Sequence, residues 1–399
     1  MRLAVRPRHL ILPACALALL GAPAPQAAEP PPSPEAQIAV PAPPPQALPA
    51  NPAGPATLTA RLQTLGLGFQ GRIGIAVEDV QQGWIASYGG QFLAPQQSVS
   101  KLWVALTVFD AIDRGQVHLD DPVVVRREDM SVFYQPIQDH LTYGPFNTTV
   151  ETLLNYQIAQ SDNAANDILD RLVGGEAAVE RVLTDRHISG IRSGPEERVL
   201  QARTAAVDWR PEYSFGRAFW AARDAVPMGT RIAALEAYLA EPEDGATAVA
   251  MVDGLARLKR GELLSPASTA KMLDIMASTE TGPMRLKSGL PEGWSIAHKT
   301  GTGQDLADLG TGYNDVGLIT APDGHVYAVA AMIASTRETI PERQAVMGDV
   351  ARAIVAVHDG IDPTTLPITQ VEAPVPVRHA GGRSGHKGRG GKPHRRHPI

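Results

Sequence analysis

Strand-like segments lie near both ends of the folded part of this chain, and helix-like segments fill the interval between them. Residues 71–78 and 83–88 predict a hairpin, because apolar and small residues alternate there. Three further strands are predicted at 295–300, 312–320 and 326–334. Strands at both ends with helices between them favour an α+β fold, with a sheet built from the two chain ends.

The helix-like segments place apolar residues at helical spacing. They are predicted at 57–65, 99–114, 150–158, 164–172, 215–223, 230–239, 247–260, 265–277 and 342–358. With 399 residues, the chain is long enough for one large domain or two small ones. Hydrophobic residues make up 44% and charged residues 20%, which is the balance of a globular protein.

The first 28 residues have the three-part pattern of a secretory signal peptide. Three arginines and no acid precede an apolar run at 10–20, and small residues continue to Ala28. The apolar run is shorter than the roughly 20 residues that a membrane anchor requires, so we expect cleavage and a periplasmic or secreted protein. Proline and alanine dominate residues 29–56, which predicts a disordered linker.

The C-terminal residues 359–399 are predicted to form a disordered tail rich in Gly, His and Arg. Residues 373–399 hold seven basic residues, four histidines and no acid, while the whole chain carries a net charge of −6. Such a tail could contact an anionic cell-envelope surface or weakly bind transition metals, or it could be a solubilising extension without a partner. Nucleic acid is not an expected partner of an exported protein. The single cysteine, Cys15, lies in the leader, so no disulfide is expected in the mature chain.

The stretch Ser98-Val99-Ser100-Lys101 opens the helix predicted at 99–114. At a helix N-terminus, unpaired backbone N–H groups and the positive end of the dipole favour a developing negative charge. Lys101 lies one turn beyond Ser98 on the same face, and a desolvated amine can take the proton of a serine hydroxyl. The stretch indicates a nucleophile with its base, although a capped helix with a solvated lysine gives the same short pattern.

Two further short motifs lie far along the chain. Ser161-Asp162-Asn163 falls at a predicted loop-to-helix junction, where these residue types also act as N-caps. The motif from His298 to Gly303, H-K-T-G-T-G, follows a predicted strand and could be a glycine turn with an exposed lysine. Each motif alone is ambiguous. The order S-x-x-K, S-D-N and K-T-G at wide separations is hard to produce by chance.

This ordered set resembles the motifs of the penicillin-recognising serine hydrolases, which include class A β-lactamases and penicillin-binding proteins. Tyr134-Gln135-Pro136 is similar to the segment that walls the class A substrate cleft, and residues 261–265 and 289–294 resemble other class A segments. The similarity covers about 58–357, which we take as a catalytic domain at 57–358. It implies an α/β sandwich domain plus an all-α domain, with an antiparallel sheet formed by both chain ends.

The class A hallmark is a glutamate, in an E-x-x-L-N segment, that primes a water molecule. Here Glu197 begins E-R-V-L-Q, 36 positions after Ser161, which agrees with the class A spacing. Glu196 is the competing candidate, and an acidic surface turn is the alternative in which neither acts. Gln201 replaces the asparagine and reaches one methylene further, so the water could be displaced and deacylation could be slow.

Two more departures from class A concern length and charge. An extra helical segment at about 207–244 concentrates aromatic residues, either as a helical pair packed on the all-α domain or as a wall that alters access to the cleft. Class A enzymes usually place an arginine near the strand after K-T-G to hold the substrate carboxylate, but residues 312–317 contain none. Arg337 and Arg343 remain as candidates, and the sequence does not place them.

The resemblance implies a mechanism without a metal or another cofactor. Ser98 attacks the β-lactam carbonyl after Lys101, or Glu197 through a water, removes its proton. The backbone N–H groups of Ser98 and Thr302 form the oxyanion hole, and Ser161 passes a proton to the departing nitrogen. Glu197 then activates the water that releases the acyl-enzyme.

The resemblance also implies the residues that bind substrate, and His298 is interpreted as structural. The binding residues are Tyr134, Asn163, Lys299, Thr300, Gly301 and Thr302. The leading hypothesis is an exported, monomeric serine β-lactamase. One alternative is a D,D-peptidase, a penicillin-binding serine hydrolase acting on peptidoglycan stem peptides. A second alternative is a catalytically inactive envelope-binding or sensing module.

Overall fold

A computed structural model describes residues 52–371 of the chain. The predicted signal peptide, the predicted linker up to residue 51 and the basic residues 373–399 lie outside the described residues. Within 52–371, every helix is either too short or too polar to cross a membrane.

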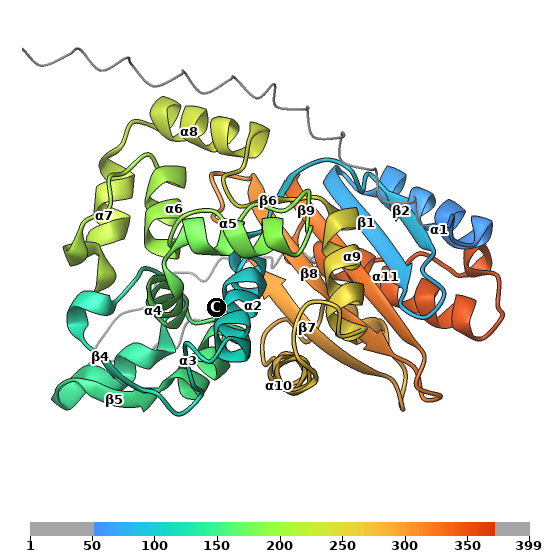
Figure 1. Cartoon of the computed structure of the whole chain (residues 1–399). Coiled ribbons are helices and arrows are strands. Elements are labelled where there is room, and N and C mark those ends of the chain that lie inside the picture. Colours follow the sequence, from blue (N-terminus) through green and yellow to red (C-terminus); the bar gives the residue numbers. More distant parts are fainter. Residues whose placement is uncertain (1–51, 372–399) are drawn as a thin grey trace, which may run out of the picture. The chain divides into compact units, whose positions relative to one another are not determined.

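A five-stranded antiparallel sheet runs in the order β2-β1-β9-β8-β7. Its strands are β1 (Gly71–Asp79), β2 (Ile85–Tyr88), β7 (Ser295–Gly301), β8 (Gly310–Thr320) and β9 (Val326–Thr336). The first two strands join the last three through the pairing of β1 with β9 (Figure 1). The prediction that both chain ends build one antiparallel sheet is therefore confirmed.

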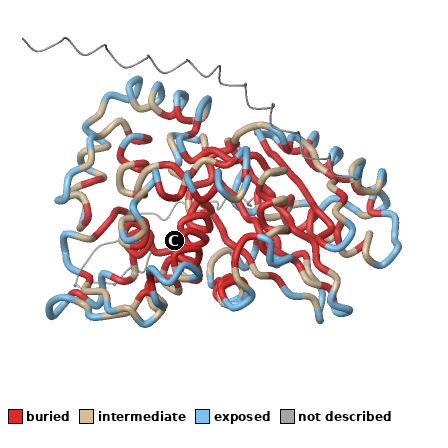
Figure 2. Tube along the Cα trace, in the orientation of Figure 1, coloured by how far each residue is buried: buried red, intermediate tan, exposed pale blue. Residues whose placement is uncertain are grey.

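Both faces of this sheet are buried. Successive side chains of β9 point to opposite faces, and they belong to two different hydrophobic cores. Ala330 packs into the core that α9 (Ala248–Lys259) shares, and Val329 packs toward α1 (Ala56–Gly68) and α11 (Ile340–His358). The helices at the two chain ends thus cover one face and α9 covers the other, which is the predicted α/β sandwich. Figure 2 shows the strands as the most continuously buried part of this half.

A helical half lies beside the sheet (Figure 1). Its helices are α2 (Lys101–Asp113), α3 (Val150–Ile158), α4 (Asn163–Val173), α5 (Glu176–Asp185), α6 (Glu197–Thr204) and α10 (Pro266–Ala277). At the centre is α2, in which every residue from Lys101 to Ala111 is buried. A helix that is apolar nearly all round must be surrounded by protein, so the chemistry at its N-terminus is held in the interior.

Two small strand pairs complete the framework. A hairpin-like pair, β4 (Pro122–Val125) with β5 (Phe146–Thr149), precedes α3. The second pair joins β3 (Ala94–Pro95) to β6 (Gly245–Ala246). This pairing brings residues just before Ser98 next to a segment about 150 positions later in the chain.

The extra segment predicted at about 207–244 forms two helices, α7 (Ala218–Ala225) and α8 (Met228–Ala240). Phe219 is buried against Val132, Ala202 and Ala205, in the helical half. Leu235 and Tyr238 are buried against Leu200 of α6. The segment is a helical pair packed on α6 and on the loop between β4 and β5, which is the first of the two predicted alternatives.

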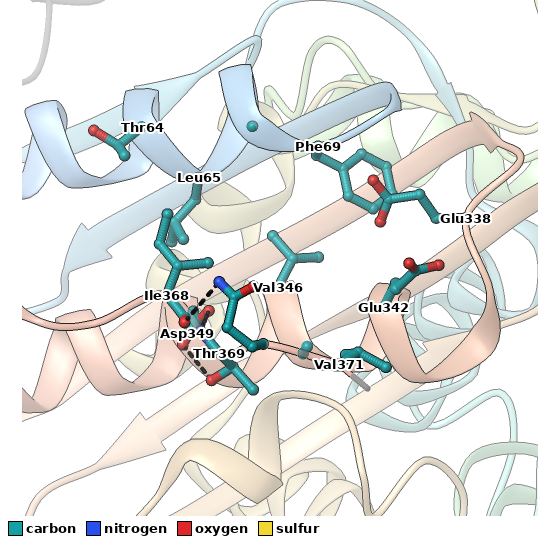
Figure 3. A pocket seen from close by; sticks show the side chains of 13 residues that line it. Thr64, Leu65, Phe69, Glu338, Glu342, Val346, Asp349, Ile368, Thr369 and Val371 are labelled. Atoms are coloured by element: carbon teal, nitrogen blue, oxygen red, sulfur yellow. Dashed lines mark hydrogen bonds between the residues drawn. The ribbon is translucent and has the colours of Figure 1, made fainter. Parts of the chain in front are cut away.

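The described structure continues beyond the predicted tail boundary at residue 359. The Arg61 guanidinium donates hydrogen bonds to the backbone oxygens of Leu366 and Pro367, both at 2.9 Å. The boundary was wrong because a residue of α1, some 300 positions earlier, holds this segment in place. Residues 368–371 also line a cavity of about 350 Å³ between α1 and α11 (Figure 3), which contains none of the predicted site residues.

Candidate active site

Ser98 lies on a short 3-10 turn, Gln97–Val99, that leads into α2. The α-helix begins at Lys101 rather than at the predicted residue 99, because this first turn is wound more tightly. Gln97 has a φ of +53°, a conformation that is costly for a residue other than glycine. Its backbone N–H donates to Asp244 Oδ2 at 2.6 Å, which helps to hold the strained turn in place.

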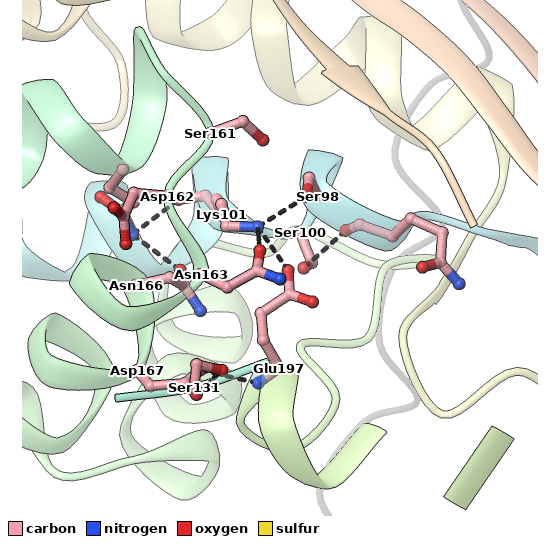
Figure 4. Close-up of polar contacts among 12 residues, drawn as sticks. Ser98, Ser100, Lys101, Ser131, Ser161, Asp162, Asn163, Asn166, Asp167 and Glu197 are labelled. Carbon is pink, nitrogen blue, oxygen red and sulfur yellow. Dashed lines mark hydrogen bonds and ion pairs between the residues drawn. The ribbon is translucent and has the colours of Figure 1, made fainter. Parts of the chain in front are cut away.

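The Lys101 side chain is completely buried and donates three hydrogen bonds (Figure 4). Its Nζ lies 2.6 Å from Ser98 Oγ, 2.8 Å from Asn163 Oδ1 and 2.6 Å from Glu197 Oε1. An ammonium has three protons, so these partners use all of its donors. Four of the predicted site residues therefore meet at one nitrogen.

The structure separates the two competing glutamates clearly. Glu197 is buried and pairs with Lys101. Glu196 Oε2 accepts from Arg198 Nε at 2.5 Å and from an Arg171 Nη at 3.3 Å, at a partly exposed site. Only Glu197 faces the serine nucleophile and its lysine.

Asp167 of α4 holds the backbone at the start of α6. Its Oδ1 accepts from the Glu197 backbone N–H at 2.7 Å, and its Oδ2 accepts from Ser131 Oγ at 2.7 Å. Burial is the main reason why the pKa of Asp167 is raised to about 7, despite the hydrogen bond from Ser131, which lowers it. No short motif in the sequence marks this carboxyl group, which fixes the backbone of Glu197.

The Ser161-Asp162-Asn163 motif contains the predicted helix N-cap and also places a side chain beside Lys101. Asp162 is the N-cap of α4 and accepts from the Ala165 backbone N–H at 2.8 Å. Asn163 donates from Nδ2 to the Val132 backbone oxygen at 2.8 Å, while its Oδ1 faces Lys101. The N-cap therefore fixes the start of the helix, and the helix start places Asn163 in the site.

Lys299 reaches the site from the edge strand β7. Its Nζ donates to Ser161 Oγ at 2.7 Å and to the Thr300 backbone oxygen at 3.0 Å. Burial, followed by the charge of Lys101, holds the pKa of Lys299 well below its usual range. Gly301 is required here, because a Cβ at this position would lie 2.4 Å from the Gln96 backbone oxygen.

His298 and Tyr134 lie outside the polar centre, which is the group of side chains that contact Lys101 or Lys299. His298 is buried, and its Nδ1 lies 2.8 Å from Asp315 Oδ1 on the neighbouring strand β8, which fits the structural interpretation. Tyr134 is 38% exposed, and its backbone oxygen accepts from the Asn163 backbone N–H at 2.9 Å. Its ring therefore stands at the surface beside the residues that hold Asn163.

Arg285 is an arginine that contacts the K-T-G-T segment, although it precedes this segment in the chain. One of its Nη atoms donates to Thr302 Oγ1 at 2.7 Å, and the other donates to the Gly301 backbone oxygen at 2.8 Å. Neither sequence candidate shows such a contact: Arg337 is exposed and pairs with Asp308, and Arg343 Nε donates to the Glu338 backbone oxygen. No sequence signal marked Arg285, since it lies in the segment before β7 and reaches Thr302 and Gly301 only through the fold.

Gln201 contacts the catalytic glutamate candidate directly. Its Nε2 lies 2.8 Å from Gln97 Oε1 and 3.4 Å from Glu197 Oε2. Gln304 Nε2 donates to Gln201 Oε1 at 3.0 Å and to the Gln201 backbone oxygen at 2.9 Å. The longer Gln201 side chain is thus held by Gln97, which precedes Ser98, and by Gln304, which follows K-T-G.

The sheet-and-helix fold and the Ser98–Lys101 pair together define a serine hydrolase of the class A type. A family model described as the β-lactamase enzyme family matches residues 57–357. The chain therefore belongs to the β-lactamase enzyme family, and the resemblance inferred from the motifs is confirmed.

Individual relatives agree with this assignment. The β-lactamase VEB-1 of Pseudomonas aeruginosa is 27% identical over 296 residues, which cover 74% of this chain and 88% of VEB-1. A crystal structure of a β-lactamase from Chitinophaga pinensis DSM 2588 is 25% identical with a TM-score of 0.63, over 75% of this chain and 99% of that one. The TLA-3 extended-spectrum β-lactamase, 23% identical with a TM-score of 0.64 over 76% and 99% of the two chains, shares the fold.

Proposed function

We propose that this chain is an exported serine β-lactamase that acts through an acyl-enzyme on Ser98 and deacylates it with water activated by Glu197. One observation carries the proposal, namely that Lys101 Nζ lies 2.6 Å from both the Ser98 hydroxyl and the Glu197 carboxylate. A nucleophile, its base and a carboxylate in hydrogen-bond contact form the arrangement that acyl transfer to water requires.

In the first half-reaction, the Ser98 oxygen attacks the lactam carbonyl and its proton leaves toward Lys101 or Glu197. The backbone N–H groups of Ser98 and Thr302 stabilise the oxyanion. Ser161 then donates a proton to the ring nitrogen as the C–N bond breaks. Its contact with Lys299 at 2.7 Å supports this role, because it links the hydroxyl to a second buried amine.

In the second half-reaction, Glu197 takes a proton from water, and that water attacks the acyl carbonyl. The backbone of Glu197 is fixed by Asp167 and its carboxylate by Lys101. Groups held in this way lose little freedom when the reaction occurs. Asn163, whose Oδ1 contacts Lys101, orients the amide of the substrate.

Recognition of the substrate carboxylate is proposed for Thr302, Thr300 and Lys299, assisted by Arg285. The Thr302 hydroxyl accepts from Arg285, so its own proton is available for an anion, and Thr302 is exposed. Arg285 supports the β-lactamase over the D,D-peptidase alternative, because it brings a guanidinium to Thr302. The contact of Gln201 with the Glu197 carboxylate supports the β-lactamase as well.

Location and further partners rest on sequence patterns alone. The signal-peptide pattern supports export to the periplasm or beyond, and the basic residues 373–399 support contact with an anionic envelope surface. We expect a monomer that needs no cofactor.

Turnover of a chromogenic cephalosporin by the purified mature chain tests the proposal. We expect hydrolysis by the native chain and neither acylation nor hydrolysis by Ser98→Ala. A stable penicilloyl adduct on Ser98, together with release of D-alanine from a D-Ala-D-Ala peptide, would establish the peptidase alternative. A Ser98 that is never labelled by a fluorescent penicillin would establish the inactive module.

A further inference from the structure

Tyr238 belongs to the inserted helix α8, yet its hydroxyl is buried beneath the nucleophile turn. It accepts a hydrogen bond from Gln97 Nε2 at 2.6 Å and donates one to Asp244 Oδ1 at 2.8 Å. The other oxygen of Asp244 accepts from the Gln97 backbone N–H at 2.6 Å. Tyr238 and Asp244 together hold the main chain and the side chain of the residue that precedes Ser98.

These contacts continue to the glutamate proposed for deacylation. Gln97 uses its Nε2 on Tyr238, so its Oε1 is the atom that meets Gln201 Nε2, at 2.8 Å. The same Gln201 Nε2 lies 3.4 Å from Glu197 Oε2. The result is a continuous series of polar contacts from Asp244 through Tyr238, Gln97 and Gln201 to Glu197.

The direction of each hydrogen bond in this series follows from the group at its end. Burial raises the pKa of Asp244 to about 6, so at neutral pH it is a carboxylate that only accepts. The Tyr238 proton must therefore point to Asp244, and the Tyr238 oxygen then accepts from Gln97. A primary amide has a donor end and an acceptor end, so this contact decides which end of Gln97 faces Gln201. Gln201 is held in the matching orientation by Gln304 as well, whose Nε2 donates to Gln201 Oε1 at 3.0 Å.

We propose that Tyr238 is a positioning residue for deacylation, acting through the amides of Gln97 and Gln201 to present an N–H group to the Glu197 carboxylate. The inference rests on the proposed function of Glu197. If the Gln97 amide turned over, its NH2 group would oppose the NH2 group of Gln201. If Gln201 then turned as well, its carbonyl oxygen would face the Glu197 carboxylate and repel it.

Acylation should not depend on the Tyr238 hydroxyl, because Asp244 Oδ2 still holds the Gln97 backbone before Ser98 when that hydroxyl is removed. The three hydrogen-bond partners of Lys101 are Ser98, Asn163 and Glu197, and neither amide of the series is among them. Comparing the rates of acylation and deacylation therefore distinguishes a positioning role of Tyr238 from a general packing role. A loss of packing around Ser98 would slow both of them.

The test variant is Tyr238→Phe, which keeps the ring between Leu200 and Leu235 and removes only the hydroxyl. The hydroxyl makes two hydrogen bonds, one to Asp244 and a neutral one from Gln97 that orients the series. Loss of the neutral bond predicts deacylation about three- to tenfold slower, with the acylation rate unchanged. Steady-state kcat and KM should fall together, and kcat/KM, which reports acylation, should stay constant. Decay of the acyl-enzyme in single turnovers, followed by mass spectrometry, measures the deacylation rate directly.

The matched control is Tyr213→Phe. Tyr213 also lies in the inserted segment, where its ring packs edge-on to Trp209 and Phe219, and its hydroxyl makes no hydrogen bond to residues 52–371. Its deacylation rate should equal that of the native chain. Thermal denaturation of both variants checks that the same fold is compared.

A double-mutant cycle with Gln201→Ala shows whether Tyr238 acts through Gln201. If it does, adding Tyr238→Phe to Gln201→Ala causes no further loss of deacylation. Equal deacylation in Tyr238→Phe and the native chain, or two losses that simply add, would overturn the inference. If Tyr238→Phe does not fold, Gln97→Ala interrupts the same series and must show the same selective loss.

A native chain that never forms or releases an acyl-enzyme would instead refute the proposed function.

Discussion

Lys101 and Glu197 form a buried ion pair, with Lys101 Nζ 2.6 Å from Glu197 Oε1. The same nitrogen contacts Ser98 Oγ at 2.6 Å, so a single ammonium links the nucleophile to the carboxylate. Breaking a buried pair by removing one partner leaves the other charge without compensation. The pair therefore couples the charges of the groups used in acylation and in deacylation. Variants of Glu197 should show how much this carboxylate contributes to each half-reaction.

Glu197→Ala should trap penicillin as an acyl-enzyme on Ser98. General-base catalysis contributes about 10²–10⁴-fold, so deacylation should slow by that factor, while acylation through Lys101 persists. A burst of one equivalent of product followed by little turnover, with the adduct mass on the protein, is the expected readout.

Glu196→Ala is the matched control for the neighbouring position. Its carboxylate pairs with Arg198 and Arg171 outside the polar centre, and partly exposed pairs of this kind contribute little. Turnover should remain within about twofold of the native chain, on that basis. Trapping by Glu196→Ala and not by Glu197→Ala would assign the deacylating role to Glu196.

The sequence was most informative where local patterns and short motifs coincide. The strand at 326–334 was predicted from a continuous apolar run, and the nucleophile helix from apolar residues at helical spacing. Both patterns are set by burial within single elements. The motif residues Ser98, Lys101, Ser161 and Lys299 could be expected to meet, because known chemistry requires them at one place. The structure adds the distances that join them.

The contacts that the sequence did not reveal are long-range and are made by common residue types. Arg285 meets Thr302 only because α10 returns the chain to the end of β7. Tyr238 looked like one more aromatic residue in an insertion, yet its hydroxyl reaches Gln97, 141 positions earlier. Neither residue stands at a spacing that a periodic pattern or a short motif would mark.

Arg285→Lys should impair binding of the substrate carboxylate. A lysine keeps the positive charge but loses the fork that contacts Thr302 and Gly301 at once. Hydrogen bonds to charged groups contribute about 1.5–3 kcal/mol, so kcat/KM should fall roughly ten- to hundredfold.

Two controls accompany the Arg285 experiment. Arg337→Ala should leave kcat/KM unchanged, because Arg337 is exposed and pairs with Asp308 away from Thr302. The methyl ester of the same β-lactam lacks the carboxylate charge, so it should react almost equally with Arg285→Lys and the native chain. An equal loss for acid and ester would show that Arg285 acts on the framework and not on the carboxylate.

Asp167→Asn should change how stability depends on pH. The folded-state pKa of Asp167 is raised to about 7 from the usual 3.8, so between these values the native state binds more protons than the unfolded state. Native stability is therefore lost as pH rises through this window, with a slope approaching about 1.4 kcal/mol per pH unit. The asparagine cannot ionise, so its stability relative to the native chain should increase from pH 5 to pH 8.

Urea denaturation of both proteins across this range measures the difference. Asp120→Asn, at an exposed position, should show no such trend relative to the native chain. A stability difference between Asp167→Asn and the native chain that stays flat with pH would mean that Asp167 ionises normally in the folded protein.

Phe219→Ala should reveal how firmly the inserted segment is attached to the site. Phe219 is almost completely buried, and the ring of Phe133 meets it edge-on with centroids 5.0 Å apart. It also packs on Val132, whose backbone oxygen accepts from Asn163. Removing a buried phenylalanine costs about 3–5 kcal/mol, and here the resulting cavity lies behind the residue that orients Asn163. We therefore expect a lower unfolding midpoint in urea together with slower acylation.

Ile232→Ala provides the comparison within the same insertion. Ile232 lies on α8 and is 42% exposed, so its truncation should change stability by no more than about 0.5 kcal/mol and leave acylation unaltered. If Phe219→Ala is equally mild, the insertion is attached loosely and cannot support Val132. If it lowers stability without slowing acylation, the loop that carries Val132 holds Asn163 without help from the insertion. Loss of both together would show that the inserted helices stabilise the substrate-binding side as well as the fold.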